Sequence, residues 1–313
     1  MFLPMPLTRP CPRSLPLRRS VLGEVELAGA RIVWLDIGEA NATVRVPQSI
    51  EVLRVRETSS VAHVAVANLS DDPLLLTSGT VLKGGWQTRV VERSIIVPPR
   101  QERAIAVPVS CVERGRWSPR TAERGGEFGT SDSMGIGMRR QTTRLKSESM
   151  RRTGCYSAPQ VAVWQSVAGE LARSGAHSAT ASYEAFLDGE RSEHRAKANH
   201  AMITPPAGCN AAMLVPPDGG WWLEAFPSPE ALAQQLESML PDVYEASAAT
   251  SKAAQVDVPA VLSALWSDEL HPLKRIRYST GDSFALAGLE RAGEVVLLEG
   301  KLAHLSVGAL AAD

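Results

Sequence analysis

Short segments rich in β-branched and aliphatic residues fill the first third of the sequence after its N-terminal stretch. They are residues 25–37, 42–46, 50–56, 61–68, 74–76, 89–97 and 104–109. Turn-forming residues separate them, for example Asp71-Asp72-Pro73 and Pro98-Pro99. Strands this short and this frequent, with little helical periodicity between them, predict an antiparallel sandwich or a barrel-like sheet in the N-terminal half.

Helical patterns enter in the second half of the sequence. Residues Ser157 to Gln160 have the pattern of a capping box before a helix. Ser228 and Pro229 precede a strongly amphipathic run, and Asp257 precedes a further helical segment at 258–266. A hairpin at 211–226 and a strand meander at 276–307 accompany these helices. The fold class we predict is therefore α+β, with a β-rich N-terminal half and a helix-plus-antiparallel-sheet C-terminal half.

Changes in composition divide the chain into four segments. Residues 1–22 carry arginines and prolines but lack the apolar stretch of a secretory signal, so we expect a disordered leader. Residues 23–113 are the β-rich unit, and 157–313 are an α+β unit that we expect to form one compact domain with it. Between them, apolar residues nearly vanish and arginine, glycine and serine prevail, which predicts a mobile loop at 114–156. This basic loop is either a lid that orders over phosphate groups or a solvated connection.

Net charge, the length of apolar runs and the spacing of cysteines and histidines limit the kinds of partner that we expect. A net charge of −1 argues against a dedicated nucleic-acid or membrane-surface protein, because such proteins usually carry a strong basic excess. No run approaches the ~20 apolar residues of a membrane helix. The cysteines form no C-x-x-C pair and the histidines show no metal-ligand spacing. We therefore predict a cytoplasmic protein without metal or cofactor, whose partner is a small molecule and neither nucleic acid nor membrane.

A candidate ligand-binding segment lies at 84–89. Gly84 and Gly85 allow a backbone to approach a ligand closely, and Gln87 and Arg89 follow two residues apart on one face of an expected strand. Arginine suits phosphate or carboxylate, and the glutamine amide both donates and accepts hydrogen bonds. The alternative is an inward arginine that loop carbonyls satisfy.

A second candidate segment runs from Cys111 to Trp117. Glu113 stands where an apolar strand ends and a polar loop begins, a position suited to an acid or base. Arg116 can hold phosphate, and Trp117 can stack on a base or anchor the loop. The structural alternative for Glu113 is a salt bridge to Arg114 or Arg116.

The fragments Gly84-Gly85-Trp86-Gln87-Thr88-Arg89 and Cys111-Val112-Glu113-Arg114-Gly115-Arg116-Trp117 resemble the signature of a prokaryotic domain family. This is the family associated with ADP-ribosylglycohydrolase (ARG) and rhodanese-phosphatase superfamily proteins, and the resemblance covers residues 23–313. The resemblance implies a protein whose role is connected with ADP-ribose or NAD-derived nucleotides, in a prokaryotic conflict or defence pathway. It also places a histidine on the strand of His304, which can act as acid, base or phosphate donor or simply be a satisfied structural residue.

These observations predict a protein that binds or processes a nucleotide-derived small molecule, with ADP-ribose or an NAD derivative implied by the family. If the protein is an enzyme, a hydrolase or a transferase is expected, with Glu113 and His304 as catalytic residues. Gly84, Gly85, Gln87, Arg89, Arg116 and Trp117 would then bind the ligand. The alternative is a non-catalytic sensor or protein-interaction domain in the same pathway.

Overall fold

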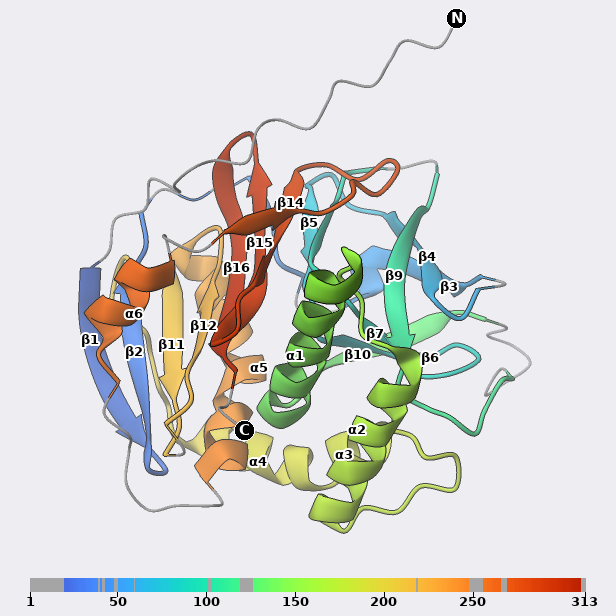
Figure 1. Cartoon of the computed structure of the whole chain (residues 1–313), viewed down its shortest axis with the longest axis horizontal. Coiled ribbons are helices and arrows are strands. Elements are labelled where there is room, and N and C mark those ends of the chain that lie inside the picture. Colours follow the sequence, from blue (N-terminus) through green and yellow to red (C-terminus); the bar gives the residue numbers. More distant parts are fainter. Residues whose placement is uncertain are drawn as a thin grey trace, which may run out of the picture.

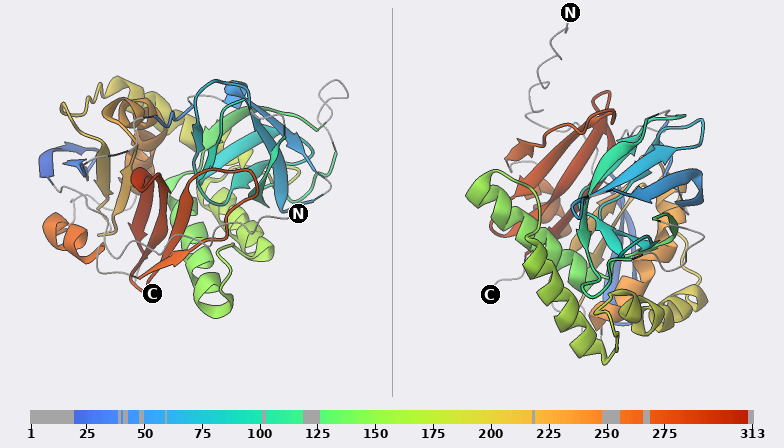
Figure 2. Two further views of the ribbon diagram at one scale, coloured as in Figure 1. Left: turned by 90° about the horizontal axis from the view of Figure 1, so that it is seen from above. Right: turned by 90° about the vertical axis from the view of Figure 1, so that its right-hand side faces the viewer.

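Two antiparallel sheets lie side by side, and helices pack between and below them (Figures 1 and 2). The computed structural model describes residues 20–38, 40, 43–47, 50–58, 60–100, 103–118, 126–217, 219–247, 256–265 and 269–310. Within these residues the fold is α+β with a β-rich N-terminal half, as the sequence predicts. Residues 1–19 of the predicted leader lie outside this description, and residues 20–22 begin a strand.

The larger sheet has eight strands. Their order is β1 (Ser20–Leu27), β2 (Ala30–Asp36), β11 (Ala211–Val215), β12 (Trp222–Ala225), β16 (Lys301–Ala309), β15 (Arg291–Leu298), β14 (Asp282–Ala287) and β13 (Leu270–Pro272). The N-terminal hairpin β1–β2 therefore pairs with β11, a strand from the second half of the chain. Strand β2 is apolar on both faces, so it needs cover on both sides, and a place inside this sheet provides it.

The second sheet has six strands and curls into a nearly closed barrel. Its order is β10 (Phe128–Ser133), β6 (Thr80–Gly84), β7 (Arg89–Val91), β9 (Ile105–Cys111), β4 (His63–Asn68) and β3 (Leu53–Glu57), with the short pair β5 (Leu74–Leu76) and β8 (Ile95–Val97) beside it and a 3-10 turn at Ile50–Val52. A bridge between Arg56 and Glu127 joins the first and last strands. Aliphatic side chains such as Val66, Leu82 and Val107 fill the interior.

Helices cover both faces of the larger sheet. Helix α6 (Val258–Leu265) packs on one face and α5 (Pro229–Ser247) on the other. Helix α1 (Ile136–Thr153) lies between the larger sheet and the barrel, and α2 (Gln160–Ser174), α3 (Glu184–Asp188) and α4 (Glu190–His200) extend below it (Figure 1). In the described part of the chain, no helix has the length and apolar character needed to cross a membrane.

The structure differs from the predicted mobile loop at 114–156, because this segment contains β10 and α1. The sequence pattern did not predict helix α1, because several of its buried positions are polar. Thr142 and Lys146 donate hydrogen bonds to backbone carbonyls, so these side chains are buried without an apolar stripe. Within the expected loop, residues 119–125 lie outside the described residues.

Two of the predicted helix caps are confirmed and one is wrong. Ser228 Oγ accepts from the backbone N–H of Ala231, and an Asp257 carboxylate oxygen accepts from that of Ala260. Helix α2 has no side-chain cap. Ser157 donates to Glu92 instead, and Gln160 binds both backbone groups of Cys111 and so holds α2 against the end of β9.

We predict that Gly308→Ala destabilises the protein by about 1–3 kcal/mol, the usual cost of overpacking. A Cβ at Gly308 would overlap the ring of Trp222 on the paired strand. Gly169→Ala is the matched control, because Gly169 is exposed on α2 with no atom within 4 Å of the added Cβ. Helix propensity makes this control neutral or stabilising by up to about 1 kcal/mol. Equal urea-unfolding midpoints for both variants would contradict the prediction.

Candidate functional site

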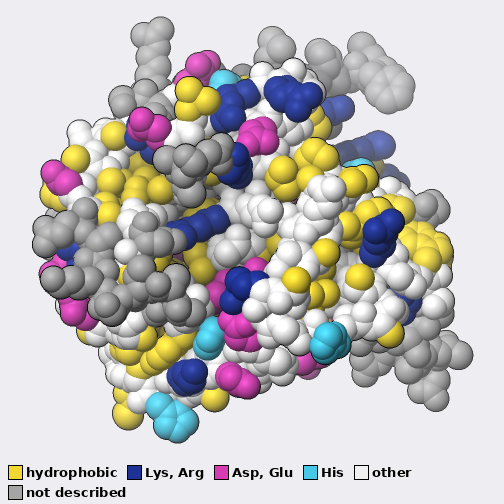
Figure 3. Space-filling view, turned by 60° about the horizontal axis from the view of Figure 1, so that its bottom comes forward, with side chains coloured by type: hydrophobic (Ala, Val, Ile, Leu, Met, Phe, Trp, Pro, Cys, Tyr) yellow, Lys and Arg dark blue, Asp and Glu magenta, His cyan; other side chains and the backbone are white. Residues whose placement is uncertain are grey.

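A polar cleft of about 210 Å³ lies where the barrel, the larger sheet and α5 meet; we call it the inter-sheet cleft. Its polar lining includes Thr77, Ser78, Thr80, Asp132, Ser133, Arg139, Arg195, Glu224, Gln234, Gln235, Glu237, Ser238 and His304. These residues come from both sheets and from α1, α4 and α5. In the space-filling view of Figure 3, which brings the bottom of Figure 1 forward, acidic and basic side chains gather near the centre.

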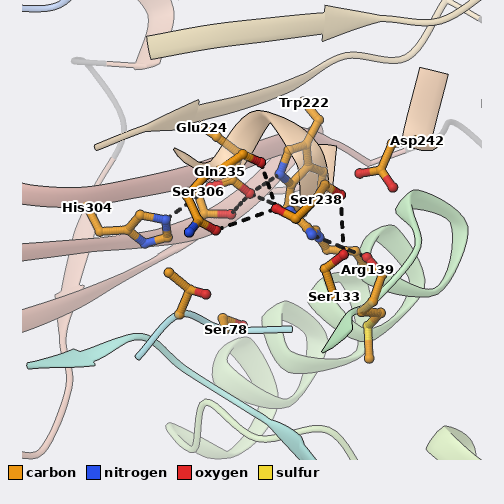
Figure 4. Close-up of polar contacts among 12 residues, drawn as sticks. Ser78, Ser133, Arg139, Trp222, Glu224, Gln235, Ser238, Asp242, His304 and Ser306 are labelled. Carbon is orange, nitrogen blue, oxygen red and sulfur yellow. Dashed lines mark hydrogen bonds and ion pairs between the residues drawn. The ribbon is translucent and has the colours of Figure 1, made fainter. Parts of the chain in front are cut away.

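Glu224 on β12 is the central charge of the inter-sheet cleft (Figure 4). One carboxylate oxygen accepts from Trp222 Nε1 at 2.8 Å, Ser306 Oγ at 2.8 Å and an Arg139 guanidinium nitrogen at 2.7 Å. The other oxygen lies 3.0 Å from Nε2 of His304. These donors satisfy a carboxylate that is only 3% exposed.

The partners of Glu224 keep it ionised despite its burial. Burial alone would raise the pKa of Glu224, but the hydrogen bond with His304 and the charge of Arg139 lower the pKa to about 2. An ionised Glu224 can only accept hydrogen bonds, so Nε2 of His304 carries the proton between them. Nδ1 of His304 is then the ring position left for acid–base exchange.

A β-bulge turns His304 toward the inter-sheet cleft. Strand β16 shifts register against β15 between Val296 and Leu297, which face His304 and Leu302. Strict alternation predicts Leu302 and His304 on one face, but Leu302 packs in the core under α6 while His304 contacts the ring of Phe226 on the other face. His304 and Ser306 do share a face, because both bind Glu224.

Two polar atoms at the inter-sheet cleft have no hydrogen-bond partner among the described residues. They are Nδ1 of His304 and Nε of Arg139, and both are buried. Leaving a buried polar atom unpaired costs about 1–3 kcal/mol, so such atoms are uncommon in stable cores. Both residues line the same cleft, where a ligand or water can supply the missing partner.

The mouth of the inter-sheet cleft carries further charges. Asp132 on β10 binds Lys83 at 3.2 Å and Arg195 at 2.5 Å. The Arg195 side chain is 36% exposed, so its guanidinium group is accessible to a ligand. Gln234 and Gln235 on α5 add amides that can both donate and accept.

Most of the predicted site residues lie in another place, at the end of β9 and the turn between β6 and β7. We call this group the Glu113 cluster; it comprises Gln87, Thr88, Arg89, Glu113, Arg116 and Thr180. Glu113 is 1% exposed and accepts from Thr88 N and Oγ1, Thr180 Oγ1 and two nitrogens of Arg116, at 2.7–3.0 Å. Burial would raise the pKa of Glu113, but the hydrogen bonds from Arg116 and Thr180 lower it to about 2.

The glycines and Gln87 serve contacts inside the Glu113 cluster. The carbonyls of Gly84 and Gly85 accept from Arg116 at 3.1 and 2.9 Å, and Gly85 has a φ of 47°. A Cβ at Gly85 would also overlap the ring of Phe128, so glycine is required there for packing as well. The Gln87 amide donates to the backbone carbonyl of Glu113 at 2.8 Å.

Arg89 and Trp117 lie at the edge of the same cluster. The Arg89 side chain is fully buried and binds Glu57 at 3.3 Å, but its Nε and Nη1 have no partner within the described residues. Its guanidinium carbon lies 5.2 Å from the ring centre of Trp117, which is 46% exposed and packs edge-on against Trp86. An exposed aromatic ring beside a buried cation is compatible with ligand stacking and with anchoring of the loop.

Of the described residues that line the inter-sheet cleft, His304 is the one that the sequence singled out. Gln87, Arg89, Glu113 and Arg116 come together in the Glu113 cluster and do not line this cleft. Glu224 and Arg139 were missed, although a lone glutamate in the apolar stretch Trp221 to Phe226 is a detectable signal. Among the described residues, no group of three or more His, Cys, Asp or Glu side chains could hold a metal ion.

We predict that Glu113→Gln lowers the free energy of unfolding at neutral pH by about 3 kcal/mol, because an ionised carboxylate with a depressed pKa stabilises the fold. That contribution is present above the unfolded-state pKa and disappears as pH falls toward 2. The difference between wild type and variant, measured by urea unfolding from pH 7 to pH 2, should therefore shrink on the acid side. Glu24→Gln, which removes an exposed ion pair, is the control and should change little. A difference independent of pH would contradict the prediction.

Comparison with known proteins identifies one family. The sequence model of the ARG and Rhodanese-Phosphatase-superfamily-associated Protein domain, ARPP-1, matches residues 16–308. No curated protein and no solved structure is significantly similar to the chain. The family match spans nearly the whole sequence and agrees with the resemblance seen in the fragments at 84–89 and 111–117. The chain therefore belongs to the family of ARG and rhodanese-phosphatase-superfamily-associated proteins.

Proposed function

We propose that the inter-sheet cleft binds and processes a phosphate-bearing, nucleotide-derived small molecule, with His304 as its acid–base group. The observation that carries this proposal is Nδ1 of His304, a buried ring nitrogen without a partner that belongs to a residue lining a polar cleft. Glu224 binds the opposite nitrogen and so orients the ring, as carboxylates do for histidines that act as bases. Hydrolysis or group transfer is the reaction type that such a pair serves.

The charges of the inter-sheet cleft support a phosphate-bearing ligand. Arg195 is accessible at the mouth, and Arg139 has a free Nε deeper inside. Guanidinium groups match phosphate oxygens in geometry and charge. The hydroxyl and amide groups of Thr80, Ser133 and Gln235 are suited to the hydroxyls of a ribose.

The family description supports ADP-ribose or an NAD derivative as the ligand class. ARG denotes ADP-ribosylglycohydrolase, and a protein that works beside such an enzyme meets ADP-ribose and its conjugates. A prokaryotic conflict or defence pathway is the setting that we propose. A ligand sensor without turnover is the alternative within the same setting.

The Glu113 cluster is a second location for the same ligand, favoured by the two unpartnered nitrogens of Arg89 beside the exposed ring of Trp117. Its carboxylate is less suited to catalysis than His304. A carboxyl with a pKa of about 2 is a weak base and holds no proton to donate at neutral pH. In this location Glu113 would hold Arg116 in place, and the free nitrogens of Arg89 would bind the ligand.

We predict that ADP-ribose stabilises the wild-type protein and that Arg195→Ala loses most of this response. Ligand at a hundred times its dissociation constant adds about 2.7 kcal/mol, which a thermal-shift or calorimetric titration resolves. Arg173→Ala is the matched control, since Arg173 is also a helix-surface arginine paired with carboxylates but lies outside the cleft lining. The panel should include NAD, ADP-ribose, mononucleotides and inorganic phosphate.

Further variants separate the two locations and the two modes of action. Loss of the response in Arg89→Ala, with Arg195→Ala unaffected, would move the ligand to the Glu113 cluster. His304→Gln should keep the thermal response but lose turnover, whereas a sensor has no turnover to lose. The absence of a thermal or calorimetric response to every ligand of the panel would contradict the proposal.

A further inference from the structure

Lys146 on α1 is a buried lysine behind the wall of the inter-sheet cleft. Its side chain is 4% exposed, and Nζ donates to the backbone carbonyl of Glu92 at 2.6 Å and to Ser78 Oγ at 3.2 Å. Both acceptors are neutral oxygens. Within the described residues, the hydrogen bonds of Nζ go to these two oxygens, and Nζ lies 5.0 Å from the ring centre of Tyr156.

The nearby carboxylates are engaged elsewhere. Glu92 accepts hydroxyl protons from Ser110 and Ser157, and Glu294 accepts from the N–H and hydroxyl of Ser94. Burial lowers the pKa of Lys146; the charges of Glu294 and Glu92 oppose this, and the positive charge of Arg139 adds to it. A lysine in such surroundings is more readily neutral than an exposed one, and a neutral amine accepts protons.

Ser78 stands between this lysine and the inter-sheet cleft. It lies in the turn between β5 and β6, lines the cleft and is only half-buried. Its backbone N–H donates to Ser94 Oγ at 2.8 Å, which fixes the turn. Ser78 Oγ donates to the carbonyl of Glu92 at 3.1 Å, and a rotation of the hydroxyl would direct its proton to the lysine nitrogen. Ser78 therefore lines the cleft, and its hydroxyl contacts the amine of a buried lysine that does not line it.

A free donor lies near Gly79, the residue that follows this serine. Nε of Arg139, which has no partner among the described residues, lies 3.7 Å from the position of a Cβ on the neighbouring Gly79. Ser78, Arg139 and His304 line one cleft and come from the turn before β6, from α1 and from β16, and Figure 4 labels all three. A hydroxyl in contact with an amine, together with a hydrogen-bond donor and a second base that line the same cleft, is the set of groups that acyl transfer requires.

From this arrangement we infer that Ser78 is a nucleophile with Lys146 as its base, and that the inter-sheet cleft hydrolyses an acyl ester. The inference deepens the proposed function and rests on it for the alcohol part of the substrate, a nucleotide-derived hydroxyl such as that of a ribose. The acyl group would be small, because the cleft has a volume of about 210 Å³.

The reaction balances in two steps. Ser78 Oγ attacks the carbonyl carbon and gives its proton to Nζ of Lys146, while Arg139 Nε donates to the carbonyl oxygen. The bond from the acyl carbon to the alcohol oxygen breaks, and that oxygen takes the proton back from Lys146. A water molecule then gives a proton to Nδ1 of His304 and adds to the acyl-serine ester, and Ser78 leaves with that proton. The products are the nucleotide-derived alcohol and a carboxylic acid.

The test is covalent labelling of the full chain with a fluorophosphonate, which transfers its phosphonyl group to activated serines and releases fluoride. Intact mass and peptide mapping should show one label, on Ser78, and Ser78→Ala should abolish it. Lys146→Met should slow labelling by about 100-fold or more, the usual contribution of a general base. Ser174→Ala is the matched control, because Ser174 is also half-buried and its Oγ donates to a backbone carbonyl, but it lies on α2 outside the cleft lining. Its labelling should equal that of the wild type.

The outcomes separate this inference from the proposed function. A wild-type protein that gains no label, or gains it on another residue, overturns the nucleophile even if ADP-ribose still binds. If Lys146→Met fails to fold, the wild-type and Ser78→Ala results decide alone. With p-nitrophenyl acetate, His304→Gln should release one equivalent of nitrophenol and then stall as acetyl-Ser78, and rapid turnover by this variant would remove His304 from the second step. Labelling of Ser78 without any response to nucleotides would support ester hydrolysis by Ser78 but reject a nucleotide-derived alcohol as part of the substrate.

Discussion

The ion pair between Arg139 and Glu224 joins α1 to the larger sheet, and the inter-sheet cleft depends on it. Both side chains are nearly buried, so neither charge is tolerable without the other, and removing one partner of such a pair typically costs about 3–5 kcal/mol. Trp222 shares the carboxylate and lies 6.0 Å from the guanidinium group. The charges that hold α1 in place therefore also determine the orientation of His304.

A second buried arginine forms a similar ion pair between helices α4 and α5. Arg191 on α4 is fully buried and binds Asp242 and Glu245 on α5. Burial and the charge of Asp242 raise the pKa of Glu245 to about 7, although Arg191 opposes the shift. Glu245 also accepts from the N–H of Gly137 in the first turn of α1. Buried charges therefore help to position α4 and the first turn of α1 against α5.

The reliance on buried polar groups explains what could be predicted from the sequence. The β-rich half and the amphipathic helices α5 and α6 follow from apolar periodicity, which short-range patterns reveal. Helix α1 could not be predicted in this way, because its buried positions include Lys146 and Thr142, residue types that are usually exposed. The pairing of β1–β2 with β11, and the meeting of Glu224, Arg139 and His304, depend on contacts between distant segments. No local pattern encodes those contacts.

Glu113 and Glu224 show why similar carboxylates have different functional prospects. Both are buried, bind an arginine and have a pKa lowered to about 2. Arg116, which donates to Glu113, is spent within the cluster because it also donates to the carbonyls of Gly84, Gly85 and Ser118. Arg89, which pairs with Glu57 and not with Glu113, keeps two nitrogens at the edge of the cluster that are unpartnered within the described part of the chain. Two of the four donors around Glu224 keep an atom that is unpartnered among the described residues, Nδ1 of His304 and Nε of Arg139, and both residues line a cleft. A closed network stabilises a fold, whereas a network with unsatisfied atoms at a cleft has bonding capacity left for a substrate.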